Sequence, residues 1–391
     1  MRSIKRSDGR HRSVHPTNAA PVPGTTDPKS VAVVGAGIMG RVLALYLVEQ
    51  GHRVTLFDRD PAEHGGAAAW TAAGMLAPWA ELESAERGIF ELGVRSLALW
   101  PALIERLGGD VDFHQRGSLV VAHPRDRVEL QRFQRRLADG LGSRDRLDSG
   151  NQLRSLDRSA LATLEPALAE AFDTALWLPG EAWLDSRRVM AALGDFLLGR
   201  GVDWRAETAV DTLGPGRITT ADGQFDCDRV FDCRGLGAAA DLPSLRAVRG
   251  EVLWLHAPEV ALSRPVRLLH PRYRLYLVPR RDDIYVLGAT QIESGDRGPV
   301  TVRSQLELLS AAWSLHPGFA EARVIHSAAN CRPALDDNLP LIDERPGLTR
   351  INGLFRHGYL LAPALAERAA GFPSLAPHWR TPAHDHHTAQ Q

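Results

Sequence analysis

The apolar pattern is clearest at residues 30–58, where it predicts a strand, a helix and a second strand. A β-rich run at 31–34 leads into glycines and then into apolar residues of helical period, which Gly51 ends. A second apolar run occupies 54–57. Such nearly continuous apolar runs are typical of parallel strands buried on both faces. The pattern therefore predicts the first unit of a parallel sheet.

Farther along the chain, helices give way to short strands separated by turns. The expected helices lie near 91–106, 126–140, 302–317 and 362–372, and a capped helix followed by a strand is expected within "WLDSRRVMAALGDFLLGRGVDWR". From residue 246 onward, strands such as "VRGEVLWLH", "YRLYLVPR" and "DIYVLGAT" dominate. We predict an α/β fold of the two-domain α+β kind, with a parallel sheet at the start, a mainly antiparallel sheet in the middle, and a return of the chain at the end.

A glycine motif of the form GxGxxG connects the first predicted strand to the first helix. Gly35 permits a tight turn, Gly37 lets backbone approach a pyrophosphate, and Gly40 lets the helix pack on the strand, while Asp58 can accept hydrogen bonds from a ribose. A chance glycine turn is the alternative. The expected dinucleotide-binding residues are Gly35, Ala36, Gly37, Ile38, Met39, Gly40, Asp58 and Arg59.

A second glycine cluster, "DCRGLGAAAD", includes Gly235 and Gly237. It would bind a second dinucleotide if a helix followed it. The next residues, "DLPSLRAVRGE", contain a proline and have no helical pattern. We therefore interpret the cluster as a turn that passes near the first cofactor.

Charge and composition exclude several functional classes. Lys+Arg 46 against Asp+Glu 47 leaves a net charge of -1, which favours neither nucleic acid nor a membrane surface as a partner. The two lysines, Lys5 and Lys29, lie near the start of the chain, so a pyridoxal Schiff base, a lysine aldolase and a Walker phosphate loop are not expected.

The cysteines and the chain ends indicate a cytoplasmic location. Cys227, Cys233 and Cys331 form no CxxC pair or metal spacing, which fits a reducing compartment and predicts no metal site. No apolar run is long enough to span a bilayer. We expect a disordered leader at 1–29 and a flexible tail at 373–391.

Six motifs in order resemble the FAD-dependent D-amino-acid oxidase superfamily, most closely glycine oxidase of the ThiO type, which is linked to thiamine biosynthesis. They are the glycine loop, "TAAGMLAP" with "WAE", "LYLVPR", "GAT", "RPALDDNLPLI" and "FRHGYLLAP". The resemblance implies non-covalent FAD and oxidation of a small amino acid or secondary amine, with molecular oxygen reduced to hydrogen peroxide. It implies a Rossmann-like FAD-binding domain of 30–81, 184–246 and 327–372, and a substrate domain of 82–183 and 247–326.

The resemblance also assigns the substrate-binding residues. Arg332 matches an arginine that binds the substrate carboxylate, and a guanidinium suits such a partner. Tyr276 matches a tyrosine at the same carboxylate, and Arg356 matches a second arginine near the active site. The alternatives are a surface salt bridge of Arg332 with Asp336 or its neighbour, a core aromatic at 276, and an ion pair at 356.

Two segments are expected to hold the flavin ring. Small residues in the first let backbone amides approach the ring edge, and the amides of the second face its pyrimidine side, with two leucines under the ring. These residues are Ala72, Ala73, Gly74 and Met75, then Gly358, Tyr359, Leu360 and Leu361. We also include Val210 and Gly235 among the cofactor-binding residues.

Some positions depart from the family pattern. Leu354 stands where relatives usually have histidine, and His357 where they usually have asparagine. Cys331 is offset by one residue from the cysteine that tethers flavin in related sarcosine oxidases, so we expect non-covalent FAD. Glu81 keeps a family position without an assigned role. A dehydrogenase of the same fold, a flavin-binding protein without turnover, and a homo-oligomer all stay open.

Overall fold

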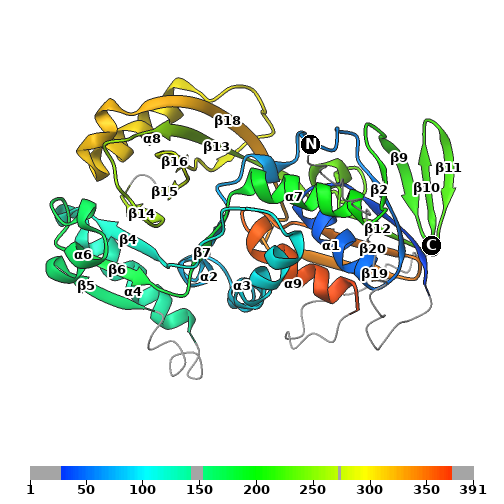
Figure 1. Cartoon of the computed structure of the whole chain (residues 1–391), viewed down its shortest axis with the longest axis horizontal. Helices are drawn as coiled ribbons and strands as arrows, with labels where there is room; N and C mark the ends of the chain where they lie inside the picture. Colours follow the sequence, from blue (N-terminus) through cyan, green and yellow to red (C-terminus); the bar gives the residue numbers. More distant parts are fainter. Residues whose placement is uncertain (1–27, 142–152, 272–273, 372–391) are drawn as a thin grey trace, which may run out of the picture.

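The computed structural model describes residues 28–141, 153–271 and 274–371. The expected tail, and all but the last two residues of the expected leader, lie outside these ranges. Two large sheets organise the described part, and Figure 1 shows them at opposite ends of the long axis. This agrees with the predicted combination of a parallel and a mainly antiparallel sheet.

The six-stranded sheet contains the nucleotide-binding unit predicted from the sequence. Its strands, in spatial order, are β19 (Leu341–Arg345), β20 (Leu348–Asn352), β12 (Arg229–Asp232), β1 (Ser30–Val34), β2 (Arg53–Phe57) and β8 (Asp203–Arg205). All neighbours are parallel except β19 and β20. The central strand β1 is buried along almost its whole length, as its apolar sequence predicts.

The nine-stranded sheet is antiparallel except where β14 meets β4. In spatial order it contains β17 (Ile292–Glu293), β13 (Arg246–His256), β16 (Ile284–Gly288), β15 (Arg274–Pro279), β14 (Val266–Leu269), β4 (Ser118–Ala122), β6 (Thr174–Leu178) and β5 (Arg154–Asp157), with β18 (Arg323–Ala334) paired to β13. Two smaller sheets comprise β3 (Met75–Leu76) with β7 (Ala182–Trp183), and β9 (Val210–Gly214), β10 (Arg217–Thr220) and β11 (Gly223–Asp226).

Helices pack between and around the sheets. They are α1 (Ile38–Glu49), α2 (Pro78–Glu81), α3 (Arg87–Leu107), α4 (Arg127–Gly140), α6 (Arg158–Leu164), α7 (Ser186–Gly199), α8 (Val302–Leu315) and α9 (Gly358–Ala369). Short 3-10 turns include η1 (Ala68–Trp70) and η5 (Gly235–Ala238). Among the described residues, no helix is both long and apolar enough to cross a membrane.

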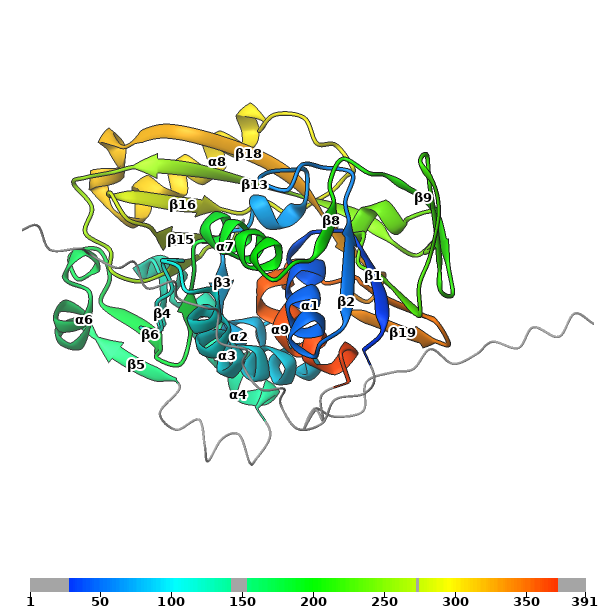
Figure 2. The same cartoon turned by 45° about the vertical axis from the view of Figure 1, so that its right-hand side comes forward.

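Two main hydrophobic cores accompany the two sheets. The larger core joins β1 and β2 to α1, α3, α7 and α9, and Figure 2 shows α1 and α9 side by side next to the six-stranded sheet. The second core lies between the nine-stranded sheet and α8. The predicted domain boundaries remain a proposal. The strands of the six-stranded sheet all fall in the segments assigned to the FAD-binding domain, but β18, most of which is assigned there too, pairs with β13 in the nine-stranded sheet. In addition, α3, which is assigned to the substrate domain, packs against α9.

The last helix, α9, starts at Gly358, four residues before the predicted start at 362. Pro363 therefore lies inside the helix, where its ring nitrogen cannot donate to the carbonyl of Tyr359. The indole Nε1 of Trp100 donates to that carbonyl at 3.1 Å. The Ala364 amide donates to Ser96 Oγ at 3.0 Å. One donor and one acceptor on α3 thus form hydrogen bonds with the backbone groups around the proline. The helix can therefore continue through Pro363.

Candidate functional site

A single cavity of about 780 Å³ extends from the glycine loop of the six-stranded sheet to Arg332 on β18. Its wall includes Gly35 and Asp58 at one end and Tyr276 and Arg332 at the other. Residues more than two hundred positions apart in the chain therefore meet around one space. A dinucleotide and a small substrate could contact each other there.

The glycines of the loop take the positions that their predicted roles require. Gly35 has a φ of 100°, and a Cβ on it would lie 2.6 Å from the Cys233 carbonyl oxygen. A Cβ on Gly40 would lie 1.9 Å from the Gly35 oxygen, so only glycine lets α1 pack this close to the loop. A Cβ on Gly37 would meet only Ala67, at 3.8 Å, so the backbone there stays open to the cavity.

Asp58 links the glycine loop to the end of β2. Its Oδ2 accepts a short hydrogen bond from the Ala36 amide, and its Oδ1 accepts one from the Asp60 amide at 2.9 Å. The carboxylate therefore fixes the loop as well as facing the cavity. The sequence predicted that Asp58 would face the cofactor, but not that it would hold the glycine loop.

We expect Asp58→Ala to raise the dissociation constant for FAD by about 10- to 100-fold, because charged hydrogen-bond acceptors contribute about 1.5–3 kcal/mol. Titration of the apoprotein with FAD measures this change. Asp203→Ala is the matched control, because Asp203 is an exposed carboxylate on the neighbouring strand β8 that pairs with Arg205. Equal affinities for the two variants would contradict a cofactor role for Asp58.

Arg41 is a further loop-binding residue, which sequence reasoning missed. It is 2 % exposed, and it lies over the rings of Trp70 and Trp204. It donates to three carbonyl oxygens, those of Ala36 (2.8 Å), Met190 (2.6 Å) and Ala62 (2.8 Å). Burial lowers its pKa to about 10. An arginine in the first turn of a helix is normally expected at the surface, so nothing in the neighbouring sequence predicted this role.

The second glycine cluster forms η5 and lines the same cavity as the first. Cys233, just before it, lies against Gly35, and the Gly235 carbonyl accepts a hydrogen bond from Asn352 Nδ2 at 3.0 Å. The structure thus places this cluster beside the first loop. This agrees with the interpretation that the cluster is a turn near the first dinucleotide site.

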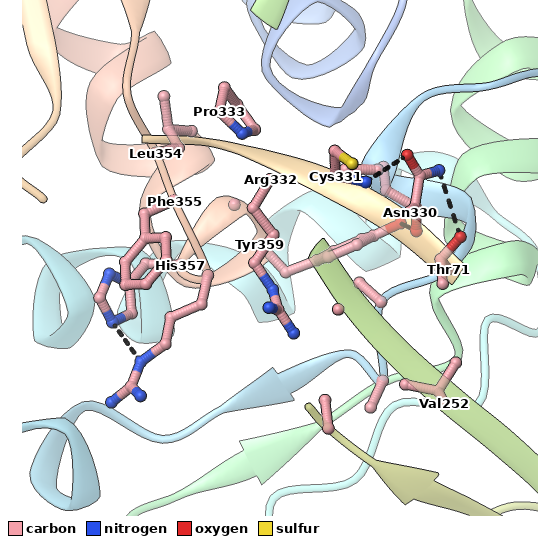
Figure 3. Close-up of a pocket in the computed structure, with 18 of the residues that line it drawn as sticks. Thr71, Val252, Asn330, Cys331, Arg332, Pro333, Leu354, Phe355, His357 and Tyr359 are labelled. Carbon is pink, nitrogen blue, oxygen red and sulfur yellow. Dashed lines mark hydrogen bonds between the residues drawn. The ribbon is translucent and has the colours of Figure 1, made fainter. Parts of the chain in front are cut away.

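Arg332 projects from β18 into the open centre of the cavity (Figure 3). Its Nη1 donates to the Thr290 carbonyl at 3.1 Å, and no carboxylate in the described residues forms a salt bridge with it. The alternative of a surface salt bridge with Asp336 is therefore not what the structure shows. A Cβ on Gly250 would lie 2.2 Å from Arg332 Nη2, so this glycine provides the space for the guanidinium. Burial lowers the pKa of Arg332.

Tyr276 lies opposite Gly288 in the register of β15 and β16. A Cβ on Gly288 would lie 3.1 Å from its phenolic oxygen, so the ring crosses a strand position without a side chain. Burial raises the pKa of Tyr276, while the charge of Arg332 opposes this shift. The phenol is therefore protonated and able to donate a hydrogen bond beside Arg332.

Glu81, at the end of α2, connects three side chains around the cavity wall. Its Oε2 accepts from Arg356 Nε at 2.9 Å and lies 2.9 Å from His357 Nε2, and its Oε1 accepts from Arg267 Nη2 at 2.9 Å. Burial alone would raise the pKa of Glu81, but Arg356 and Arg267 hold it well below its usual range. Arg356 lines the cavity as part of this ion pair, which was the alternative to a free second arginine.

His357 lies buried between Glu81 and Phe355. Burial lowers its pKa, although the hydrogen bond with Glu81 opposes this shift, so the imidazole is neutral near pH 7. The 2.9 Å contact favours a proton on Nε2, donated to the carboxylate. Nδ1 has no hydrogen-bond partner among the described residues. This histidine therefore supports Glu81 rather than adding a second charge.

The two predicted flavin segments lie on the cavity wall with one exception. Ala72, Ala73, Gly74 and Met75 line it, as do Gly358, Tyr359 and Leu360. Leu361 does not, because it is fully buried in the larger core and its amide donates to the His357 carbonyl at 2.8 Å. The prediction that Leu361 lies under the ring with a free amide is therefore not supported.

Val210 is also away from the cavity. It lies on β9 and packs against the small core of Ile218 and Val230. Ala36 and Gly40, which were also predicted to contact the cofactor, do not line the cavity. Of the remaining predicted cofactor contacts, Ile38, Met39, Arg59 and Gly235 line the cavity.

The cations on the cavity wall are arginines, together with histidines. Lys29, the lysine in the described part of the chain, lies exposed just before β1. The Cys331 thiol lies 3.4 Å from the Asp296 carbonyl oxygen, to which it donates, and Figure 3 shows its sulfur on the opposite side of β18 from the Arg332 guanidinium. No group of metal-ligating side chains occurs among the described residues.

The residues present fit a dinucleotide with a redox ring. The open backbone at Gly37 and the start of α1 can receive a pyrophosphate. The first-turn amides of α9, at Gly358, Tyr359 and Leu360, have no acceptor within the helix and can donate to an anionic ring edge. The uncompensated guanidinium of Arg332 lies on the same cavity.

Comparisons with known proteins agree with this geometry. The family of FAD dependent oxidoreductases called DAO matches residues 30–371. A putative thiamine biosynthesis oxidoreductase ThiO of Rhizobium etli is 45% identical over 340 residues, covering 87% of this chain and 95% of the relative. The crystal structure of glycine oxidase from Geobacillus kaustophilus has a TM-score of 0.76 at 27% identity, covering 88% of this chain and 94% of that one. Iminodiacetate oxidase from Chelativorans sp. BNC1 has a TM-score of 0.74 at 29% identity, covering 89% and 97%.

Proposed function

Because this chain belongs to the DAO family of FAD-dependent oxidoreductases, we propose that it oxidises glycine or another small amino acid or secondary amine to the imine. Hydrolysis of the imine then gives the oxo acid and ammonia or an amine. Oxygen takes up the two electrons and two protons and leaves as hydrogen peroxide. FAD, when bound, would supply the electron acceptor between the amine and oxygen.

The observation that carries the proposal is the uncompensated guanidinium of Arg332 in the cavity of the glycine loop. A buried cation without a carboxylate partner is a strong site for an anionic group. Tyr276 adds a protonated hydroxyl at the same place. Together they suit the carboxylate of an amino acid and would fix the orientation of its Cα.

Arg356 has a different task in this proposal. Its charge is shared with Glu81, so it adds a positive field to the wall without a free fork for a second carboxylate. Cys331 donates to backbone carbonyls, which supports non-covalent binding of FAD. The 45% identity to a putative thiamine biosynthesis oxidoreductase supports a place in thiamine biosynthesis. The cytoplasmic location stays a prediction from the cysteine pattern.

The test is an anaerobic bleaching screen of the purified protein. We expect a yellow protein whose visible absorbance falls on addition of glycine, sarcosine or a small D-amino acid, and returns with hydrogen peroxide when oxygen is admitted. Bleaching that only an artificial dye reverses would indicate a dehydrogenase with a quinone or protein acceptor. If no amine bleaches the FAD-loaded protein, it is a flavin-binding protein without turnover. Failure to bind FAD would contradict the proposal at its first step.

A further inference from the structure

Three successive carbonyl groups of the segment 72–74 are held from behind the cavity wall. The Ala72 oxygen accepts from Ser186 Oγ at 2.6 Å, and the Gly74 oxygen accepts from the Leu184 amide at 3.0 Å. Between them, the Ala73 oxygen accepts from Arg280 Nη2 at 2.6 Å. These three hydrogen bonds to carbonyl oxygens hold the segment in place, and none of them uses its backbone N–H groups.

The geometry of a trans peptide sets where those amides point. In the peptide unit that joins Ala73 to Gly74, the carbonyl and the N–H face opposite directions. Because Arg280 holds the carbonyl from behind, the Gly74 N–H is directed to the cavity side, where Gly74 lines the wall. No hydrogen bond of this amide occurs among the described residues. It is therefore a free donor.

Arg280 is built into this position. Its side chain is 6% exposed and comes directly after β15, four residues beyond Tyr276. Its Nη1 donates to the Pro279 carbonyl at 3.1 Å, and its Nε lies 3.7 Å from Asp185 Oδ2. That carboxylate already accepts from the Arg187 amide at the start of α7. One arginine therefore joins the strand of Tyr276 to the wall segment.

The guanidinium that donates to the Ala73 carbonyl also polarises the N–H group of the same peptide unit. Hydrogen bonds in series polarise one another, most strongly where the local dielectric is low. The Gly74 N–H therefore becomes a stronger donor toward whatever lies against it. A donor at the edge of a flavin stabilises the negative charge that the ring gains on reduction.

We propose that Arg280 is a positioning residue: through the Ala73 carbonyl it aims and strengthens the Gly74 amide as a donor to bound FAD, and so raises the reduction potential of the flavin. The proposal rests on the FAD-dependent function above, because FAD must lie against this segment. Arg280 itself does not line the cavity and acts only through the peptide.

The test compares Arg280→Met and Arg280→Lys with Arg281→Met. Arg281 is the adjacent residue, 45% exposed, and its partners Asp110 and Asp112 are outside the cavity wall, which makes it a matched control. The measurements are the FAD dissociation constant of the apoprotein, the visible spectrum, and the midpoint potential against reference dyes. Wild-type binding of FAD is established first, so a failure of the proposed function is seen before any variant is interpreted.

For Arg280→Met we expect a roughly tenfold weaker affinity for FAD, a shifted visible spectrum and a more negative midpoint potential. Arg280→Lys keeps a charge and is expected to restore part of the potential, and it serves as the test variant if the methionine variant does not fold. Arg281→Met should leave all three quantities unchanged. A potential that equals that of wild type in the folded Arg280 variants would overturn the proposal and leave the arginine a purely structural role.

Discussion

Arg332→Met is expected to lower kcat/KM for glycine by about 100- to 1000-fold while the protein still binds FAD. Truncating one partner of a buried charge pair typically costs 2–5 kcal/mol, roughly the range of that loss. Arg332 has Nη2 and Nε without partners in the described residues, so its donors are available to a carboxylate. Steady-state assays of hydrogen peroxide formation measure the effect.

The Arg332→Met variant also distinguishes a role of Arg332 in substrate binding from a role in the stability of the fold. Because no described carboxylate pairs with Arg332, its removal leaves no buried anion unpaired. We therefore expect thermal stability without substrate to stay the same or rise. Arg332→Lys should retain part of the activity, since it keeps the charge but loses the planar fork. Arg323→Met, an exposed arginine on the same strand, is the control. An unchanged kcat/KM in Arg332→Met would contradict the proposed substrate anchor.

Glu81→Gln is expected to lower the free energy of unfolding by about 3–5 kcal/mol, because it removes the buried carboxylate that pairs with the partly buried guanidiniums of Arg267 and Arg356. Arg267 and Arg356 both depend on this one carboxylate. Urea unfolding at pH 7 measures the loss. The control is Glu91→Gln, whose surface pair with Arg87 should contribute at most about 0.5 kcal/mol. Equal losses for the two variants would show that the cluster is not a special source of stability.

The pH dependence of stability follows from the direction of the shift at Glu81. Its pKa in the folded protein lies well below the ordinary value of 4.5. The contribution of Glu81 is therefore fully present above that value and is lost as the pH falls through the lower, folded pKa. We expect Glu81→Gln to unfold with a weaker dependence on pH in this acid range than wild type. An identical acid slope would contradict this assignment.

The glycine loop could be predicted from the sequence because its determinants are local. Gly35, Gly37 and Gly40 act within one turn, and Asp58 follows the next strand. In the structure Gly35, Gly37 and Asp58 line one cavity and Gly40 packs against Gly35, while their contact with FAD stays a prediction. Arg332 and Tyr276 came from a resemblance, and the structure brings both to the same cavity.

The Glu81 cluster could not be predicted in the same way. Its partners Arg267 and Arg356 are 186 and 275 residues away along the chain. Arg41 and Arg280 were missed for a related reason, since each donates to a carbonyl oxygen of a segment far away along the chain, and such a contact leaves no pattern in the sequence. The early start of α9 depends on Trp100, which lies on another helix.

The described wall of the cavity carries arginines and histidines but no lysine, and this composition affects the fate of the product. Oxidation of glycine followed by hydrolysis gives an oxo acid that is also a reactive aldehyde. Aldehydes condense with the free amine of a lysine, whereas a guanidinium stays protonated and does not. Since Lys29 is not part of the wall, the described residues of the cavity can hold anions by positive charge without offering a lysine amine to the product. Such a protein would resist self-modification over many turnovers.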